Sequence, residues 1–277
     1  MLLLLAALTG IAQELVVCSY NVRLHTDRDE RKGEVWSRRC QALCDQMNFV
    51  RPDVLGVQEL LPDQKRDLLA ALDGYGCIGL PRDDGETKGE RSAIFYRFDR
   101  VELLDSGTFW LSETPNQPSY GWDADCRRVC SWGKFRDRLT GKVFCHYNLH
   151  MDHIGVVARR ESALLVMDSI NHLNAGVPVV LTGDFNVAQT DPVLSTFTAS
   201  GVLKDCYHAA KYRFAENGTY MGYDSGAYTD ERIDHVFVSA NSQVNRYGIL
   251  TDCYWTGDPP VRHTISDHYP VVVTVSL

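Results

Sequence analysis

Residues 177–186 read Val-Pro-Val-Val-Leu-Thr-Gly-Asp-Phe-Asn, and this stretch decides the fold. The β-branched run from Val177 to Thr182 predicts a strand, and Gly183 permits a close backbone approach at its end. Alternation along an extended chain puts Asp184 and Asn186 on the same side. This carboxylate and amide are suited to orienting a water nucleophile, and an Asx-type turn is the structural alternative.

Other strand-like runs also deliver residues that bind metals or move protons. Residues 15–22 contain Asn21, residues 54–57 lead to Gln58-Glu59, and residues 143–149 lead to His150-Met151-Asp152-His153. Nearer the C-terminus, Asp234 lies within an apolar run and Ser266-Asp267-His268 precedes another. Carboxylate, amide and imidazole groups delivered repeatedly to strand ends predict one metal-assisted hydrolytic site.

The apolar runs alternate with helical patterns, which predicts one α/β domain over residues 14–277. Trp36, Cys40, Leu43, Met47 and Val50 recur at helical spacing and predict a helix over residues 34–50 with this face in the core. Residues 63–72 and 156–173 predict further helices, and Asp191-Pro192 marks the cap of another. Strand-like runs at 233–238 and 270–275 make the sheet mixed.

The strand-end residues suit particular roles. Glu59 follows an apolar strand, where a hard cation (Mg²⁺, Mn²⁺ or Ca²⁺) would compensate its charge. His150 is a candidate for phosphate stabilisation, with Asp152 and His153 supporting or structural. His268 is a candidate general base or phosphate contact, Asp234 its orienting carboxylate, and Asp267 a metal ligand or supporting acid. Taken alone, each residue also has an ordinary structural interpretation.

Composition limits the classes of partner. The formal net charge is −8, which argues against a broad basic surface that tracks nucleic acid, although a nuclease remains compatible with an acidic metal site. Nine cysteines is an odd number, so at least one thiol stays unpaired in a monomer. Their spacings match no zinc motif, and we expect mainly buried, free cysteines.

Residues 1–13 are mostly apolar and end near small residues, as in a secretory signal. No basic segment precedes this run, which leaves two interpretations: a signal that is truncated at its start, or an N-terminal strand or tether. No stretch approaches the roughly 20 apolar residues that span a membrane. We therefore expect an extracytoplasmic protein, periplasmic or secreted.

Two segments are predicted to shape the site. Residues 81–90 are charged and contain glycine, which indicates an exposed loop. Residues 106–132 lack a clear period and contain Trp110, Trp122 and Trp132, so we expect a substrate-shaping insertion. These rings are suited to stacking on bases, but packing of the insertion onto the sheet is the favoured interpretation.

Taken in order, six motifs resemble the endonuclease/exonuclease/phosphatase superfamily of metal-dependent phosphohydrolases, the DNase I-like fold. They are Tyr20-Asn21, Gln58-Glu59, Asn148-Leu149-His150, Gly183-Asp184-Phe185-Asn186, Ile233-Asp234-His235-Val236-Phe237 and Ser266-Asp267-His268. They span nearly the whole chain. The resemblance implies a four-layer α/β/β/α sandwich of two mixed β-sheets flanked by helices, with the site at one edge.

The resemblance also implies roles for these residues. Glu59 matches the family's principal Mg²⁺ ligand. Asn21 matches a residue that positions the metal or the phosphate, and Asp267 matches an acid close to the metal. Asp184 and Asn186 match the pair that activates and orients water. His150 matches the phosphate-stabilising position, and Asp234 with His268 the paired acid and imidazole.

The segments 109–115 and 121–124, with Arg128 and Trp132, are similar to a bacterial secreted branch of the superfamily. Arg128 is a candidate contact for the substrate phosphate, and a surface ion pair is the alternative. Asn21 is followed by Val22-Arg23 and not by a second Asn or Asp, which weakens a DNA-repair assignment.

The sequence therefore predicts a Mg²⁺-dependent phosphoester hydrolase in which water attacks phosphorus. Its candidate substrates are nucleic acid, a phospholipid head group such as sphingomyelin, or a phosphorylated sugar or inositol. A non-catalytic binding protein on the same fold is the competing class. We expect a monomer without an obligate protein partner.

Overall fold

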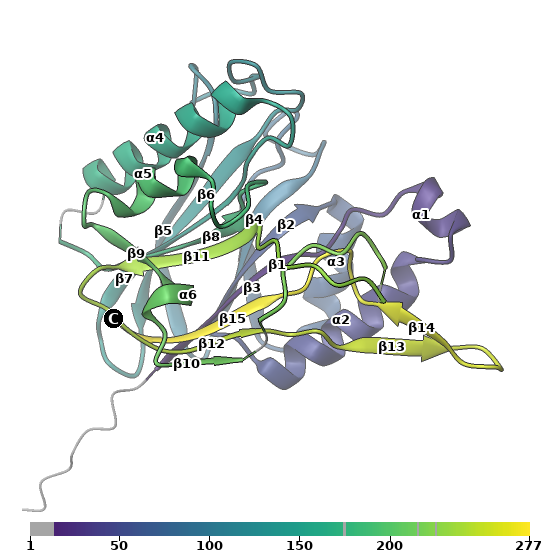
Figure 1. Ribbon diagram of the computed structural model, residues 1–277. Coiled ribbons are helices and arrows are strands. Elements are labelled where there is room, and N and C mark those ends of the chain that lie inside the picture. The colour runs from purple at the N-terminus through teal and green to yellow at the C-terminus, as the bar shows by residue number, and fades with distance from the viewer. Residues whose placement is uncertain (1–13, 174–175, 215, 225) are drawn as a thin grey trace, which may run out of the picture.

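The computed structural model describes residues 14–173, 176–214, 216–224 and 226–277. The predicted secretory signal over residues 1–13 lies outside the described residues. Two β-sheets pack face to face, and helices cover the outer face of each sheet (Figure 1). The predicted four-layer arrangement of two mixed sheets is confirmed.

The first sheet has seven strands in the order β10-β12-β15-β1-β2-β4-β3. They are β1 (Leu15–Asn21), β2 (Val54–Leu60), β3 (Tyr75–Ile78), β4 (Arg91–Arg97), β10 (Tyr212–Phe214), β12 (Gln243–Ile249) and β15 (Val271–Ser276). Strand β1 runs parallel to β2 and antiparallel to β15. Every residue of β2 is buried, which explains its unbroken apolar start.

The second sheet has six strands in the order β5-β6-β7-β8-β11-β9. They are β5 (Val101–Trp110), β6 (Val129–Asp137), β7 (Val143–His150), β8 (Val179–Asp184), β9 (Leu203–Asp205) and β11 (Asp234–Ser239). Strand β7 runs parallel to β8, whereas β11 runs antiparallel to it. Strands β13 (Cys253–Thr256) and β14 (Val261–Thr264) form a separate hairpin.

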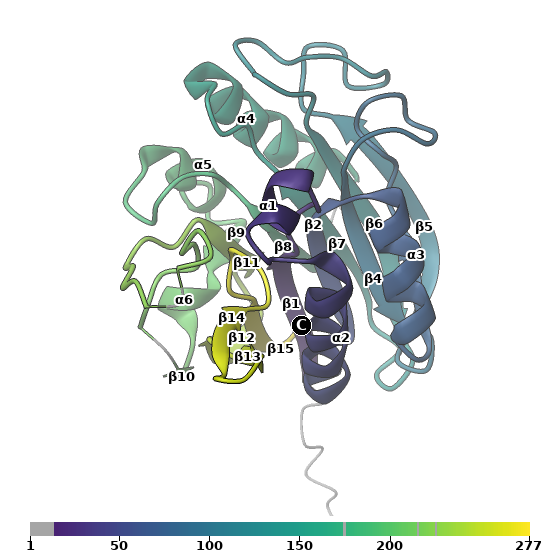
Figure 2. The ribbon, with the colours of Figure 1, turned by 90° about the vertical axis from the view of Figure 1, so that its right-hand side faces the viewer.

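Helices form the two outer layers (Figures 1 and 2). The helical elements are α1 (Asp27–Arg31), α2 (Trp36–Val50), α3 (Pro62–Ala71), α4 (Val156–Leu173), the 3₁₀ turn η1 (Pro192–Leu194), α5 (Ser195–Thr198) and α6 (Cys206–Ala209). Leu43 and Met47 of α2 and Leu68 of α3 pack against the first sheet. Helices α4 and α5 cover the second sheet through residues such as Val166 and Phe197.

The two sheets approach closely through a polar seam behind the strand ends. Gln58 donates from Nε2 to Oδ1 of Asn148 across 2.7 Å, and Thr182 donates to the same oxygen across 3.0 Å. Gly56 makes the approach possible, because a Cβ atom there would collide with the side chains of Thr182 and Asn148. The seam fixes the end of β2 relative to the ends of β7 and β8.

The long predicted helices and strands are confirmed with small shifts at their ends, and Asp191 caps η1 as expected by accepting from the Val193 N–H. The expectation for residues 106–132 is wrong in extent. Their two ends belong to β5 and β6, and only residues 111–128 form the loop between them. Residues 104–106 of β5 are all exposed, so this strand lacks the alternation of buried and exposed residues that marks a strand in sequence.

The tryptophans and cysteines are mainly structural. Trp110 is buried and donates from Nε1 to the Arg82 carbonyl across 2.7 Å, and Trp132 packs against the core under α4. All nine cysteines are free, as expected, and five of them (Cys18, Cys44, Cys130, Cys145 and Cys206) are buried. Within the described ranges, no helix is long and apolar enough to cross a membrane.

Candidate active site

Strand direction explains why the candidate residues meet at one edge. The parallel pairs β1–β2 and β7–β8 place Asn21, Glu59, His150 and Asp184 at or near the carboxyl ends of their strands. Strand β11 runs the other way, so its first residue, Asp234, lies directly opposite Asp184. Antiparallel β15 begins at the same edge, where His268 and Asp267 precede it.

Asn21 connects Glu59, the predicted metal ligand, with Asp184, a predicted catalytic carboxylate. Its Nδ2 donates to Glu59 Oε1 and to Asp184 Oδ2, each across 3.0 Å. Its Oδ1 accepts the backbone N–H of Arg23 across 3.0 Å. The amide nitrogen of Asn21 therefore bonds to the two carboxylates, and its oxygen bonds to the Arg23 backbone. The predicted contact of Asn21 with a metal or a phosphate stays a prediction.

Asp184 lies between two histidines. Its Oδ2 is 3.4 Å from Nε2 of His150 and 3.8 Å from Nε2 of His268. Burial raises the pKa of Asp184 to about 7, and the Asp234 carboxylate contributes to the rise. A carboxylate with a pKa near neutrality suits proton transfer from water.

His268 is held by a carboxylate behind it. Its Nδ1 donates to Asp234 Oδ2 across 2.8 Å, and both side chains are buried. Burial opposes protonation of His268, but Asp234 outweighs it and, with Asp184 and Asp267, raises the pKa to about 10. Of the two predicted roles for His268, a phosphate contact that donates from Nε2 fits this protonated imidazole better than a general base.

His150 has the opposite electrostatic environment. Burial lowers its pKa, and Arg128 and Arg82 act in the same direction. A neutral imidazole still donates one hydrogen bond, so the predicted phosphate-stabilising role needs no protonation here.

Arg128 is buried, so the alternative of a surface ion pair does not hold. Its Nε lies 3.4 Å from Asp152 Oδ2, and its Nη2 donates to Nδ1 of His153 across 3.0 Å. Asp152 also accepts backbone N–H groups from Cys126, Ile154 and Gly155. Asp152 therefore has the supporting role considered from the sequence, because it fixes Arg128 and the loop around it.

Asn186 lies in the Asx-type turn that was the structural alternative for the Gly183–Asn186 motif, and its predicted role in orienting water stays a prediction. Its backbone has a φ of +52° and donates to Asp184 Oδ1 across 2.9 Å, which is an Asx-type turn. Its side-chain Nδ2 donates to the Met151 carbonyl across 2.9 Å. Glu59 and Arg23 also have positive φ angles, +61° and +56°, so strained backbone clusters at this edge.

A cavity of about 370 Å³ lies over these groups. Seven of the nine predicted site residues line it: Glu59, Arg128, His150, Asp184, Asn186, Asp267 and His268. Asn21 and Asp234 lie behind it and contact the lining residues. The volume falls near the lower end of the range for small-molecule sites, roughly 300–1,000 Å³.

Sequence reasoning missed four charged or aromatic lining residues, Arg23, Arg82, Glu90 and Tyr220. Arg82 and Glu90 lie in the loop over residues 81–90, which had been expected to shape a site. The Tyr220 ring lies 5.0 Å from the ring of His268, but no local pattern marks it. Arg23 had been noted only as a departure from the DNA-repair pattern.

The acidic groups fit a hard divalent cation. Glu59 and Asp267 share Arg23, whose Nη1 is 3.6 Å from Glu59 Oε2 and whose Nε is 3.7 Å from Asp267 Oδ2. Burial raises the pKa of Asp267, and the Glu59 carboxylate acts in the same direction. Donor atoms of Asp184, Asp234 and His268 also lie within 4.8 Å of one another. Oxygen donors of this kind suit Mg²⁺, Mn²⁺ or Ca²⁺.

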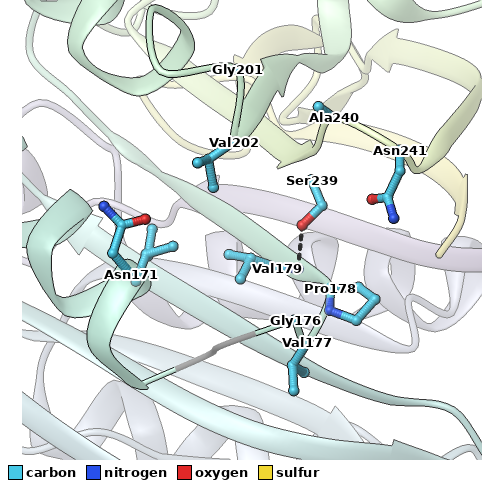
Figure 3. Close-up of a pocket in the computed structure, with 11 residues that line it drawn as sticks. Asn171, Gly176, Val177, Pro178, Val179, Gly201, Val202, Ser239, Ala240 and Asn241 are labelled. Atoms are coloured by element: carbon cyan, nitrogen blue, oxygen red, sulfur yellow. Dashed lines mark hydrogen bonds between the residues drawn. The ribbon is translucent and has the colours of Figure 1, made fainter.

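A second cavity, of about 400 Å³, lies at the opposite end of β8 (Figure 3). Its walls include Asn171, Val179, Val202 and Ser239, and Ser239 Oγ accepts the Val179 N–H across 2.8 Å. None of its lining residues that the structure describes carries a charge. It offers no group for acid–base chemistry, so the catalytic candidate is the cavity at the other end of the strand.

Comparison with known proteins places this geometry in a family. Residues 18–268 match the model of the Endonuclease/Exonuclease/phosphatase family. A mannosyl-6-phosphatase from Bacteroides thetaiotaomicron is 46% identical in sequence, with a TM-score of 0.93 over 95% of this chain and 100% of that one. A family member from Bacteroides vulgatus is 36% identical, with a TM-score of 0.87 over 96% of this chain and 99% of that one.

Nocturnin from Drosophila melanogaster is a more distant relative, 22% identical over 68% of this chain. The match covers only 30% of nocturnin's length. The chain belongs to the Endonuclease/Exonuclease/phosphatase family. It is accordingly an enzyme that hydrolyses phosphate ester bonds, in a family that generally depends on a divalent metal.

Proposed function

We propose that the protein is a Mg²⁺-dependent phosphatase that releases phosphate from a phosphorylated sugar. The observation that carries this proposal is the cavity of about 370 Å³, in which acids, histidines and Arg128 line a space sized for a small molecule. The 46% identity to a mannosyl-6-phosphatase supports the sugar over the other candidates. The net charge of −8 also disfavours a polymeric nucleic acid.

Each cavity group has a proposed task. Asp184 accepts a proton from the attacking water, and Asn186 helps to orient that water. His150 and His268 donate hydrogen bonds to the phosphate oxygens, where charge develops in the transition state, and Arg128 binds the same group. Glu59 and Asp267, with Asn21, would hold Mg²⁺, which supplies Lewis-acid stabilisation of the phosphate oxygens when bound.

The test is a hydrolysis assay of the purified protein with Mg²⁺, with and without EDTA. The panel contains a hexose 6-phosphate, an aryl phosphate, an aryl phosphodiester, single- and double-stranded DNA, and sphingomyelin. We expect chelator-sensitive release of phosphate from the hexose 6-phosphate, with Asp184→Asn lowering kcat by about 100-fold or more. Asp168→Asn, an exposed helix position, is the matched control. Faster hydrolysis of a diester, DNA or sphingomyelin would reject the sugar-phosphatase proposal.

We also propose that the protein is exported, as a member of a bacterial secreted branch of the family, with residues 1–13 as its signal. The support is the apolar pattern of these residues. N-terminal sequencing of the protein from fractionated cells tests this, because export predicts an extracytoplasmic form that begins near Glu14. An intact N-terminus in the cytoplasmic fraction would contradict it.

A further inference from the structure

Arg82 and Glu90 form a charged pair in the cavity wall that has no task in the proposed hydrolysis. Nη1 of Arg82 donates to Oε2 of Glu90 across 2.9 Å, and Nη2 lies 2.5 Å from Oε1. Both side chains are largely buried, with 16% and 12% of their surfaces exposed. Both also line the cavity that contains His150 and Asp184.

The loop that carries the pair is fixed by its own hydrogen bonds. The backbone N–H of Arg82 donates to the Glu90 carbonyl across 2.9 Å, and Trp110 donates to the Arg82 carbonyl. At the tip, Asp84 Oδ1 accepts three backbone N–H groups, from Glu86, Thr87 and Lys88. The pair is therefore held in place before any ligand binds, which lowers the entropy cost of recognition.

The pair keeps unused hydrogen-bonding capacity. Arg82 Nε is buried and has no hydrogen-bond partner among the residues that the structure describes, and it lies 4.0 Å from Asp83 Oδ1. A guanidinium has five N–H donors, and the Glu90 carboxylate retains lone pairs beyond those that face Arg82. Adjacent donors and acceptors at fixed spacing match the neighbouring hydroxyl groups of a sugar ring, each of which both donates and accepts.

We propose that Arg82 and Glu90 form a subsite for the sugar hydroxyl groups and select polyol phosphates over phosphate esters without hydroxyls. This inference rests on the proposed sugar-phosphatase function. Arg128 and His150 line a small adjoining cavity together with Arg82 and Glu90, and His150 Nε2 is also 3.4 Å from Oδ2 of the catalytic Asp184. A substrate therefore has its phosphate at the histidines and its ring toward the loop over residues 81–90.

The experiment compares kcat/KM for a hexose 6-phosphate with kcat/KM for p-nitrophenyl phosphate. Glu90→Gln and Arg82→Lys should each lower the ratio of the two values by about tenfold or more. Only the hexose has hydroxyl groups that form hydrogen bonds with the charged pair, so the substitutions weaken hydrolysis of the sugar phosphate more than that of the aryl phosphate. Arg136→Lys and Glu102→Gln are matched controls, since that pair makes a similar 2.7 Å contact on the exposed surface. The controls should leave the ratio as in the wild type.

A second measurement needs no variant. The wild-type enzyme should hydrolyse a hexose 6-phosphate about tenfold or more faster, in kcat/KM, than analogues that lack ring hydroxyl groups. If the variants lose kcat/KM equally on both substrates, the subsite proposal is wrong, but the proposed phosphatase function still stands. The same holds if the wild-type enzyme hydrolyses the analogues without ring hydroxyl groups as fast as the hexose 6-phosphate. No hydrolysis of either phosphate ester by the wild type would overturn the proposed function itself, and the subsite with it.

Discussion

His268 donates from Nδ1 to Oδ2 of Asp234 across 2.8 Å, and His268 lines the cavity whereas Asp234 lies behind it. The contact leaves Nε2 of His268 as the nitrogen that faces Asp184 and the substrate space. The second oxygen of Asp234 is buried without a side-chain or backbone partner in the described part of the chain. Asp234 thus acts through the imidazole and not on the substrate.

Replacing Asp234 with Asn should lower kcat by about 100-fold or more, because the amide no longer favours the protonated imidazole or its orientation. The effects of Asp234→Asn and His268→Asn should be strongly non-additive, since each change disables the same donor. Steady-state kinetics of both single variants and the double variant measure this. Fully additive losses would mean that Asp234 acts independently of His268.

Glu59→Gln should weaken Mg²⁺ binding by about tenfold or more, because the change removes a carboxylate charge that a hard cation requires. Isothermal titration of the purified protein with Mg²⁺ measures the affinity without reference to activity. Glu102→Gln is a suitable control, since that carboxylate is exposed on β5 and is paired with Arg136. Unchanged affinity in Glu59→Gln would place the metal elsewhere.

The residues at the strand ends could be predicted because each follows a local pattern. A buried run such as 179–182 followed by Gly183 and Asp184 specifies both the strand and the side that its polar residues take. Parallel pairing then places His150 beside Asp184 in one sheet and Asn21 beside Gln58 in the other, and the packing of the two sheets brings these ends to one edge. These predictions needed only short segments and the geometry of packed sheets.

The remaining wall of the cavity depends on long-range packing. Tyr220 reaches His268 because residues 219–222 form backbone hydrogen bonds with residues 267–269, an association that neither segment encodes alone. The loop over residues 81–90 was predicted, but its contact with Trp110 of β5 decides which of its charges line the cavity. The hairpin of β13 and β14 was also missed, because its short, half-exposed strands carry little apolar alternation.

Gly56→Ala should destabilise the fold by about 1–3 kcal/mol, because the added methyl group would push the two sheets apart at Thr182 and Asn148. Urea denaturation followed by circular dichroism measures the free energy of unfolding. Gly248→Ala in β12 is the matched control, since its Cβ atom would meet its nearest neighbour at 3.8 Å, an ordinary contact distance. Equal stability of the two variants would show that the seam between the sheets adapts easily.

His146 gives the protein a specific sensitivity to acid. It is fully buried between the sheets, with Nε2 2.8 Å from Thr182 Oγ1, and burial lowers its pKa from 6.5 to about 3. Between these values the unfolded chain binds a proton that the folded chain does not, so stability falls as the pH falls below about 6.5. The contribution of this residue reaches about 1.4 kcal/mol per pH unit.

Replacing His146 with Gln should therefore flatten the loss of stability between about pH 6 and pH 4, whatever its effect at neutral pH. Denaturant titrations at several pH values measure the difference in slope between wild type and variant, and pH effects common to both proteins cancel. His172→Gln, at an exposed position of α4, is the matched control. Parallel curves for wild type and His146→Gln would mean that the buried imidazole takes up its proton without unfolding, and that water reaches the seam between the sheets in the native protein.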